Sequence, residues 1–408
     1  MIISSLLDLD FYKLTMAQVA WKRFRDVPVT YAFTNRTRKV RLAEVVREAD
    51  LNRELDRIRG LRFGPDELDW LRESRHIKRG LFQDGFLDHL GRLRLPECQV
   101  AVEDGQFVIE TSGTWPEAML WETLILSAVN ELYYKALLEK EGFSWRQPWI
   151  IGQQRLADKL ALLKTRVPGV RIIEFGTRRR FSGDWQSEVV RTIAAAAPQM
   201  LVGTSNVALA RRLDLPPIGT FAHEMFMVLA GRAGGDDAAL RGSHNEVLRS
   251  WWDEYGEPLS IALTDTFGTD FFFRDFAPEQ AAKWRGLRQD SGDPAVFGEK
   301  AIAFYRGLGI DPATKLVVFS DGLDAETIIA LEEKFSGRIR TAYGWGTNLT
   351  NDCGHGPLSL VVKASRAGGR PTVKLSDNMA KAMGPAAEVE RYKRVFGHVD
   401  GQNQDCVY

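Results

Sequence analysis

From about residue 170 to residue 365, the chain repeats a pattern in which a short apolar run ends in a polar or glycine-rich turn and a helical stretch follows. The runs are VRIIEFGTRRR, MLVGTSN, PIGTFAHE, LSIALTDTFG, RGLRQDSGD, KLVVFSDGLD and RTAYGWGTN, with LSLVVKAS (358–365) as a candidate for one more strand. Alternation of strand and helix predicts a parallel sheet. Seven or eight such units in about 220 residues favour a closed α/β barrel, although the periodicity alone also allows an open sheet.

The first 145 residues follow a different pattern. Residues 40–95 are rich in charge and leucine, at spacings that predict two or three amphipathic helices. Segment 97–112 alternates apolar and polar residues around Asp104-Gly105, which predicts a β-hairpin, and 119–140 predicts a long, strongly apolar helix. A segment containing glycine, serine and proline then breaks the pattern, so we place a domain boundary near residue 145.

Composition and charge argue against several classes of function. The formal net charge is zero, which gives no overall basic field to recruit nucleic acid or an anionic membrane. The chain has no run of about 18 apolar residues, and its first segment, MIISSLLDLDFYKL, lacks a basic leader, so we expect neither a membrane span nor a signal peptide. Cys98, Cys353 and Cys406 cannot all pair and have no metal-binding spacing, which favours a reduced, cytoplasmic compartment.

The polar residues of the second half gather at one kind of position, directly after an apolar run. They are Arg178, Ser205, His223, Asp265, Arg288, Asp290, Asp321 and Gly344. In a parallel barrel these positions converge on one mouth, where such folds place their chemistry. Loops are polar in most proteins, but these loops carry arginine, aspartate, histidine and glycine rather than the usual lysine and glutamate. We therefore expect a functional site at this mouth.

Several of these loops suit a phosphorylated ligand that carries a sugar and a flat ring. The glycines of AYGWGTN (342–348) would let backbone amides approach an anion. Arg178 and Arg288 can make forked hydrogen bonds to phosphate or carboxylate, and Asp321 can hold sugar hydroxyls. Phe175 offers a face on which a heterocycle can stack, with an ordinary core phenylalanine as the alternative. The absence of a GxxxxGK[ST] motif argues against an ordinary P-loop ATPase.

His223 opens the helix-like run HEMFMVLAG after a Gly-Thr turn. The positive end of a helix disfavours imidazolium, which keeps the ring neutral and nucleophilic, and it stabilises a phosphoryl group once one is attached. A neutral histidine in a phosphate-binding mouth is therefore a candidate phosphoryl acceptor, with a structural histidine that makes one hydrogen bond as the alternative. Asp265 and Glu224 are both candidates for the carboxylate that orients the ring.

Ten motifs, in order along the chain, resemble those of the bacterial type of nicotinate phosphoribosyltransferase, and the resemblance runs from residue 6 to about residue 395. The most specific are DFYKLTM (10–16), EFGTRRR (174–180), GTFAHE (219–224), LRQDSGDP (287–294) and VKLSDNMAKAMG (373–384). The resemblance implies an irregular α/β barrel of the type II phosphoribosyltransferases with an N-terminal α+β domain. We expect residues 1–145, joined by 370–408, to form that domain and residues 146–369 to form the barrel.

The resemblance also implies a reaction. The phosphoribosyl group of 5-phosphoribosyl 1-diphosphate would move to nicotinate and give nicotinate mononucleotide and diphosphate, in the biosynthesis and salvage of NAD. The family couples this transfer to ATP hydrolysis through a phosphorylated histidine. Mg²⁺ is expected to travel with diphosphate, because no dedicated metal-binding motif occurs in the sequence. A homodimer is the expected assembly, with no nucleic-acid partner and no membrane.

By this resemblance, His223 is the phosphorylated histidine and Asp265 its orienting carboxylate. Phe175 and, from a neighbouring subunit, Tyr12 would hold the pyridine ring between them. The other implied contacts are Arg178 for phosphate, Arg288 for the nicotinate carboxylate or the adjacent phosphate, Asp290 and Asp321 for ribose hydroxyls, Gly322, Gly344, Gly346 and Thr347 for the 5-phosphate, Arg36 from across a dimer interface for diphosphate, and Lys374 and Lys381 for ATP or diphosphate.

Ser205 bears on the choice of substrate. The related nicotinamide enzyme places an aspartate where the motif GTSN has this serine. An aspartate would accept a hydrogen bond from a carboxamide and repel a carboxylate, whereas serine can donate a hydrogen bond to a carboxylate. Ser205 therefore favours nicotinate over nicotinamide.

Three alternatives stay open at the level of sequence. Quinolinate phosphoribosyltransferase is related in fold, but it lacks the histidine and is shorter. A non-catalytic nucleotide-binding protein would not need His223, Arg288 or Asp290. An aldolase-like enzyme that acts on a sugar phosphate would need a Schiff-base lysine at a strand end, and no strand end before residue 360 offers an obvious one.

Overall fold

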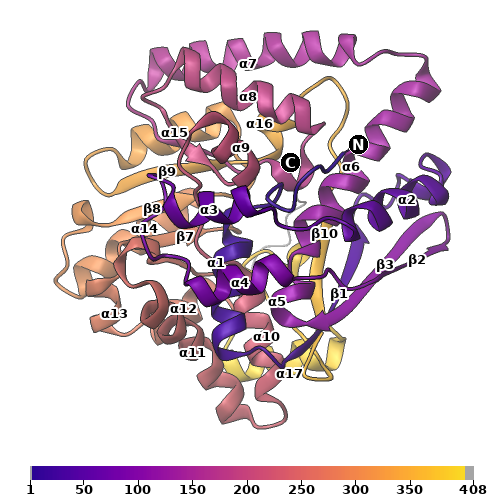
Figure 1. Cartoon of the computed structure of the whole chain (residues 1–408). Coiled ribbons are helices and arrows are strands. Elements are labelled where there is room, and N and C mark those ends of the chain that lie inside the picture. The colour runs from indigo at the N-terminus through magenta and orange to yellow at the C-terminus, as the bar shows by residue number, and fades with distance from the viewer. Residues whose placement is uncertain (1, 400–408) are drawn as a thin grey trace.

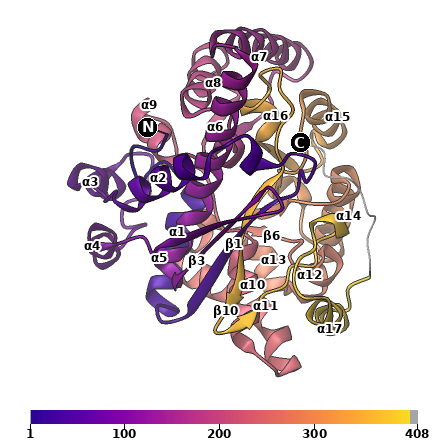
Figure 2. The ribbon, with the colours of Figure 1, turned by 90° about the vertical axis from the view of Figure 1, so that its right-hand side faces the viewer.

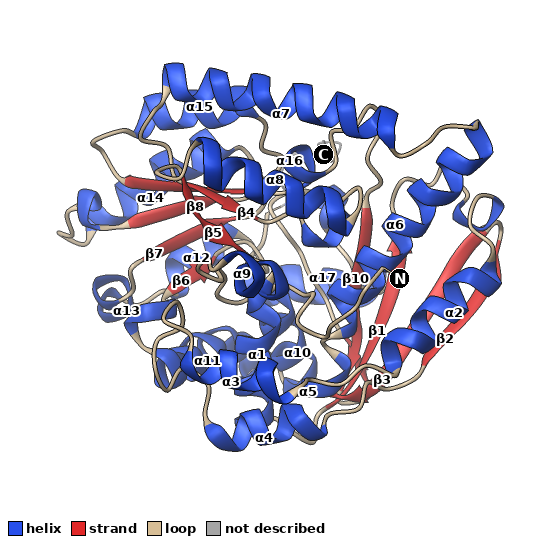
Figure 3. Cartoon of the chain, turned by 45° about the horizontal axis from the view of Figure 1, so that its top comes forward, coloured by secondary structure: helices blue, strands red, loops and turns tan. Residues whose placement is uncertain are grey.

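The computed structural model describes residues 2–399, which form two β-sheets and the helices around them (Figure 1). Figure 3 separates the two sheets by position, with the parallel strands β4–β8 on one side of the molecule and β1, β2, β3 and β10 on the other. Cys98 and Cys353 are free thiols, and Cys406 lies outside the described residues.

The antiparallel sheet has five strands in the spatial order β11-β10-β1-β3-β2. Their bounds are β1 (Pro28–Asn35), β2 (Cys98–Glu103), β3 (Gln106–Thr114), β10 (Leu360–Ala367) and β11 (Arg370–Pro371). The expected hairpin is confirmed as β2 and β3, and Asp104 and Gly105 have φ values of 49° and 74°, as the two central residues of a type I′ turn require. The run LSLVVKAS is a strand, but it pairs with β1 of this sheet instead of extending the parallel one.

The parallel sheet has six strands in the order β5-β4-β9-β8-β7-β6. Their bounds are β4 (Ile172–Glu174), β5 (Leu201–Thr204), β6 (Ile261–Leu263), β7 (Gly286–Gln289), β8 (Leu316–Phe319) and β9 (Arg340–Trp345). The strand expected in PIGTFAHE is wrong. Pro216 and Pro217 have no N–H to give to a ladder, and this segment makes an isolated bridge between Thr204 and Pro217 instead.

The proline segment lies between the two end strands of the parallel sheet. The backbone N–H of Ile218 donates to the carbonyl oxygen of Thr204, in β5, at 2.8 Å. On the other side, Thr220 Oγ1 donates to the carbonyl oxygen of Ile261, in β6, at 3.3 Å. One cavity is lined by residues from all six strands, so the sheet curves around it.

Helices cover both sheets. The N-terminal helices are α1 (Phe11–Arg23), α2 (Glu48–Arg59), α3 (Pro65–Glu73), α4 (Asp84–Arg92), α5 (Trp115–Ala118), α6 (Trp121–Glu141) and α7 (Arg146–Arg166). The later ones are α8 (Gly183–Ala196), α9 (Val207–Leu213), α10 (His223–Ala233), α11 (Asp237–Tyr255), α12 (Thr269–Asp275), α13 (Pro278–Lys283), α14 (Pro294–Gly307), α15 (Ala325–Phe335), α16 (Thr347–Thr350) and α17 (Ala386–Phe396). The helices expected in 40–95 and 119–140 are thereby confirmed as α2, α3, α4 and α6. Within residues 2–399, no helix combines the length and the apolar character needed to cross a membrane.

The two sheets are joined by buried contacts rather than by a shared ladder. Figure 2 shows β1 and β10 side by side with α10 next to them, and α10 packs on β10. The tryptophans Trp115 and Trp121, at the starts of α5 and α6, are fully buried in the same core as the helices of the parallel sheet. The N-terminal elements thus pack against the half of the molecule that holds the parallel sheet.

Gly286 provides a test of the parallel sheet. It starts β7 and pairs with both β6 and β8, and an added Cβ would overlap the backbone carbonyl of Leu316. We expect Gly286→Ala to lower the free energy of unfolding by about 1–3 kcal/mol or more, because a backbone neighbour cannot move aside as a side chain can. Gly242, inside α11 with nothing within 4 Å of an added Cβ, is the matched control, and Gly242→Ala should gain roughly 0.5–1 kcal/mol. Urea unfolding measures both, and equal stability of the two variants would contradict this packing.

Candidate active site

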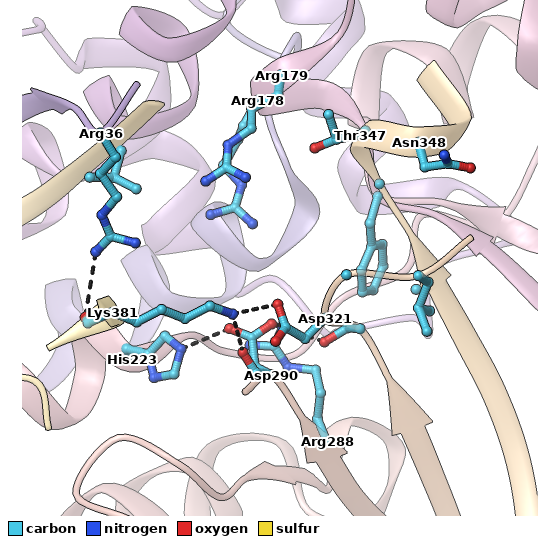
Figure 4. A pocket seen from close by; sticks show the side chains of 18 of the residues that line it. Arg36, Arg178, Arg179, His223, Arg288, Asp290, Asp321, Thr347, Asn348 and Lys381 are labelled. Atoms are coloured by element: carbon cyan, nitrogen blue, oxygen red, sulfur yellow. Dashed lines mark hydrogen bonds and ion pairs between the residues drawn. The ribbon is translucent and has the colours of Figure 1, made fainter. Parts of the chain in front are cut away.

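A pocket lined by charged side chains lies at the carboxyl ends of the parallel strands (Figure 4). Seven cationic side chains and two carboxylates face it, although the whole chain has no net charge. In Figure 4, Arg178 and Arg179 reach in from one side, and His223, Asp290 and Asp321 lie on the other. The expected site residues that line it are Arg36, Phe175, Arg178, His223, Arg288, Asp290, Asp321, Gly322, Gly344, Gly346, Thr347, Lys374 and Lys381.

His223 is the first residue of α10, and it is 3% exposed. Its Nδ1 lies 3.0 Å from Thr266 Oγ1, and its Nε2 lies 2.8 Å from Asp290 Oδ2 and 2.9 Å from Lys374 Nζ. Burial lowers the pKa of His223 to about 4, and the charge of Lys374 adds to that effect. The imidazole is therefore neutral at neutral pH, as the sequence predicts, and retains a lone pair on one of its two nitrogens.

The carboxylate within hydrogen-bond distance of the His223 ring is Asp290, whereas Asp265, the expected orienting carboxylate, has an oxygen within 4.8 Å of a ring nitrogen. Asp265 is fully buried, and it lies 3.7 Å from Lys374 Nζ, which in turn contacts the ring. The orienting role expected for Asp265 stays a prediction. The side chain of Glu224, the other candidate, contacts Lys13, Tyr31 and Trp115 instead of the imidazole.

Asp290 directly follows β7, and Asp321 comes two residues after the end of β8, close to the strand ends as the sequence predicts. Lys381 Nζ forms an ion pair with the carboxylate of Asp321 and donates to the backbone carbonyl of Asp290 at 3.0 Å (Figure 4). Burial favours the neutral form of Asp290, but the charges of Arg288 and Lys381 and the hydrogen bond to His223 outweigh it and hold the pKa of Asp290 well below its usual range. Asp290 is therefore an ionised acceptor at physiological pH.

Glycine is required where the backbone approaches other groups closely. A Cβ on Gly344, in β9, would overlap the ring of Phe175, so this glycine creates the space in which the ring lies. Gly322 has φ 58°, in the left-handed region that favours glycine, and it turns the chain after Asp321. Gly346 and Thr347 continue the same edge at the start of α16.

A second cavity adjoins the charged pocket. The residues that line both are Phe175, Arg178 and Arg288. Tyr12 and Ser205 also line the second cavity, and its deeper walls are apolar side chains of the parallel strands, such as Val318. A mostly apolar cavity therefore adjoins a strongly cationic pocket.

In the second cavity, Ser205 forms a hydrogen bond with a residue of the N-terminal segment. Its Oγ donates a hydrogen bond to Asp10 Oδ1 at 2.7 Å, so a carboxylate from the N-terminal segment already lies beside it. Burial raises the pKa of Asp10, although Arg178, at 3.5 Å, opposes that shift. Asp10 was not among the residues that the sequence places near Ser205.

Tyr12 and Arg36 line these cavities from the same chain. The resemblance implied that a neighbouring subunit supplies both residues. In the structure, Tyr12 OH lies 3.4 Å from Glu122 Oε2, and Arg36 donates to the carbonyl oxygen of Lys381 at 3.4 Å. Both residues therefore line the cavities within this chain, and the contribution expected from a second subunit stays a prediction.

Sequence reasoning missed several residues of the site. Lys363, on β10, lines the charged pocket, and Thr266 contacts the His223 ring. Lys13 and Glu122 are buried behind the residues that line the pocket, and Lys13 Nζ lies 2.6 Å from Glu122 Oε2. A signal for Glu122 does exist, since it is the one charged residue in the first ten residues of this helix.

Three residues could in principle hold a metal ion. Ligand atoms of His223, Asp265 and Asp290 all lie within 4.8 Å of one another. The ammonium of Lys374 lies 2.9 Å from one of these atoms and 3.7 Å from another, and so it already compensates the carboxylates there. This donor set therefore fits a resident divalent cation poorly.

Comparison with known proteins gives consistent matches over almost the whole chain. Residues 170–399 match the model of the nicotinate phosphoribosyltransferase family, and residues 7–130 match the model of its N-terminal domain. The chain is 34% identical to a nicotinate phosphoribosyltransferase from Vibrio cholerae, with a TM-score of 0.88 over 98% of this chain and 95% of that one.

Two further solved structures are similar. The nicotinate phosphoribosyltransferase from Porphyromonas gingivalis is 30% identical, with a TM-score of 0.87 over 97% of this chain and all of that one. A putative nicotinate phosphoribosyltransferase from Saccharomyces cerevisiae is 28% identical, with a TM-score of 0.85 over 98% and 99% of the two chains. On the family match and these similarities, the chain belongs to the nicotinate phosphoribosyltransferase family.

Proposed function

We propose that this chain transfers the phosphoribosyl group of 5-phosphoribosyl 1-diphosphate to nicotinate, with coupling to ATP hydrolysis, in NAD salvage. The observation that carries the proposal is the union of two cavities that share Phe175, Arg178 and Arg288. One has a mostly apolar lining with the aromatic rings of Tyr12 and Phe175, which suits a pyridine ring, and the other offers seven cations to a ligand with several phosphates. Family membership supports the same reaction.

The transfer itself needs little acid or base catalysis. The pyridine nitrogen would attack the anomeric carbon as its bond to diphosphate breaks, through an oxocarbenium-like state. Phe175 and Tyr12 would hold the ring, and Arg288 lies where it can bind the nicotinate carboxylate. Arg178 and Arg36 would stabilise the negative charge that develops on the leaving diphosphate. Mg²⁺ would arrive bound to diphosphate, as part of the substrate.

Asp290 and Asp321 would accept hydrogen bonds from the ribose hydroxyls. Lys381 is paired with Asp321, so the lysine has to move before that carboxylate can accept from a sugar. The released ammonium would then be close to the diphosphate. Gly344, Gly346 and Thr347, along the edge of β9, would face the 5-phosphate.

Coupling to ATP would use His223. The γ-phosphoryl group of ATP would move to a ring nitrogen as its bond to the β-phosphate oxygen breaks and ADP leaves, and water would later cleave the phosphorus–nitrogen bond. The neutral state of the ring supports this role, because an imidazolium has no lone pair to attack phosphorus. A phosphoryl group at the N-terminus of α10 would be stabilised by the helix dipole and by Lys374.

We also propose that the curved six-stranded sheet is the irregular α/β barrel of the type II phosphoribosyltransferases. Segment 216–220, which is hydrogen-bonded to both end strands, would complete it. The division into residues 1–145 with 370–408 and residues 146–369 is a proposal of the same kind.

The direct test supplies nicotinate, nicotinamide or quinolinate together with 5-phosphoribosyl 1-diphosphate and Mg²⁺, with and without ATP. We expect nicotinate to give nicotinate mononucleotide, at a higher rate when ATP is present. We expect little product from nicotinamide or quinolinate. Chromatography of the nucleotide product measures this. Product from quinolinate alone, or none from any of the three, would refute the proposal.

For His223→Ala, we expect the stimulation by ATP to disappear while a slow, ATP-independent transfer remains, because the phosphoryl acceptor is lost but the ring and sugar contacts stay. The comparison of initial rates with and without ATP measures the coupling. His76→Ala, which removes a histidine that contacts Asp214 away from the pocket, is the control and should keep full stimulation. Normal coupling in His223→Ala would remove His223 from this role.

For Ser205→Asp, we expect the ratio of kcat/KM for nicotinate to that for nicotinamide to fall about tenfold or more, because a second carboxylate beside Asp10 repels the acid. Ser205→Ala removes the hydroxyl without adding charge, and it should change the ratio much less. Steady-state kinetics with both substrates decide the matter, and an equal change in the two variants would show that charge at this position does not set the preference.

A further inference from the structure

Glu122 is a buried carboxylate that contacts three cationic side chains. It lies in the first turn of α6 and is 2% exposed. Its Oε2 lies 2.6 Å from Lys13 Nζ, and its Oε1 lies 3.4 Å from Arg178 and 3.3 Å from Lys363. Arg178 and Lys363 line the charged pocket, whereas Glu122 stands behind them. The carboxylate is thus within reach of the cations that meet the substrate but not of the substrate itself.

Lys13 joins Glu122 to a second buried carboxylate. Its Nζ forms an ion pair with Glu224, the residue that follows His223 in α10. Glu224 also accepts hydrogen bonds from Tyr31 OH at 2.6 Å and Trp115 Nε1 at 2.7 Å. Buried charges persist when they are paired and hydrogen-bonded in this way. The cluster therefore fixes the place of Glu122 relative to both α1 and α10.

We propose that Glu122 is a positioning residue, which holds Arg178 and Lys363 side by side and charged at the diphosphate end of the pocket. The inference rests on the proposed function, because it concerns how the ribosyl donor and diphosphate are bound. Two cations this close to one pocket repel each other, and a carboxylate that contacts both offsets the repulsion and fixes both side chains. Glu122 would act on the substrate through these two residues.

The charge of Lys363 depends on its neighbours. The pKa of Lys363 is lowered to about 8, with burial as the largest cause, Glu122 in opposition, and the charges of Arg178, Lys374 and Lys13 adding to the effect of burial. Loss of the negative charge of Glu122 would lower the pKa of Lys363 further, because that carboxylate favours the ammonium form. Lys363 would then lose its proton closer to neutral pH, and the pocket would lose affinity for an anion.

The experiment measures the binding of inorganic diphosphate by isothermal titration calorimetry, from about pH 6 to about pH 10. We expect Glu122→Gln to bind diphosphate roughly tenfold or more weakly at about pH 8, and the alkaline loss of affinity to begin about one pH unit or more lower than in the wild type. In turnover, KM for the ribosyl donor should show the same displacement, with a smaller change in kcat. Titration of diphosphate itself is common to all variants and cancels in the comparison.

Two further variants separate positioning from folding. Lys363→Arg carries a charge that does not titrate in this range, so its affinity should lack the alkaline loss, and in the double variant Glu122→Gln/Lys363→Arg much of the affinity at about pH 8 should return. Glu254→Gln is the matched control. The side chain of Glu254 is 1% exposed and pairs with Lys22 of α1, away from the pocket, so this variant should lose stability without a displaced pH profile.

An unchanged pH profile in Glu122→Gln, or the same displacement in Glu254→Gln, would overturn the inference. If Glu122→Gln does not fold, Lys363→Arg decides, because a wild-type alkaline loss of affinity in that variant would rule out Lys363 as the titrating cation. Failure of the proposed function is a different result. It would appear in the wild type as diphosphate binding without any formation of nicotinate mononucleotide.

Discussion

The antiparallel pairing of β1 with β10 is the interaction on which the candidate site depends most. Residues from Val29 opposite Ala367 to Asn35 opposite Leu360 join two strands that are more than 320 residues apart in the chain. Arg36 directly follows β1, and the segment after β10 carries Lys374 and Lys381. The ladder therefore sets both ends of the chain over the mouth of the parallel sheet, and without it the cationic half of the pocket would not exist.

Burial of this many charges has a cost that the surrounding hydrogen bonds must offset. The structure meets it by pairing buried carboxylates with cations, as with Glu122 among Lys13, Arg178 and Lys363, and by leaving His223 neutral. The remaining excess of positive charge faces the pocket. A ligand that brings several negative charges, with its own Mg²⁺, would relieve the repulsion that the empty pocket retains. The electrostatics thus favour a phosphorylated ligand before any family is considered.

Much of the catalytic half could be predicted from sequence because its signals are local. An apolar run followed by a polar turn identifies both a strand and its carboxyl end, and so Asp290, Asp321 and the glycines of β9 are found together without knowledge of the sheet order. The same rule failed for PIGTFAHE, where two prolines make an apolar run look like a strand although they cannot donate to a ladder. It also put LSLVVKAS in the wrong sheet, since a run of that composition fits either a parallel or an antiparallel partner.

What could not be predicted depends on pairings between distant residues. Local pattern nominated Asp265 and Glu224 as partners of His223, but the ring is contacted by Asp290, which lies 67 residues further along. Glu122 went unnoticed for the same reason, although a glutamate in the apolar first half of α6 is itself a signal. A charge in a helix face that packs into the core is stable only if an opposite charge meets it there, and here three do. A charge within an apolar stretch of a helix therefore predicts buried partners, even when the sequence does not say which residues they are.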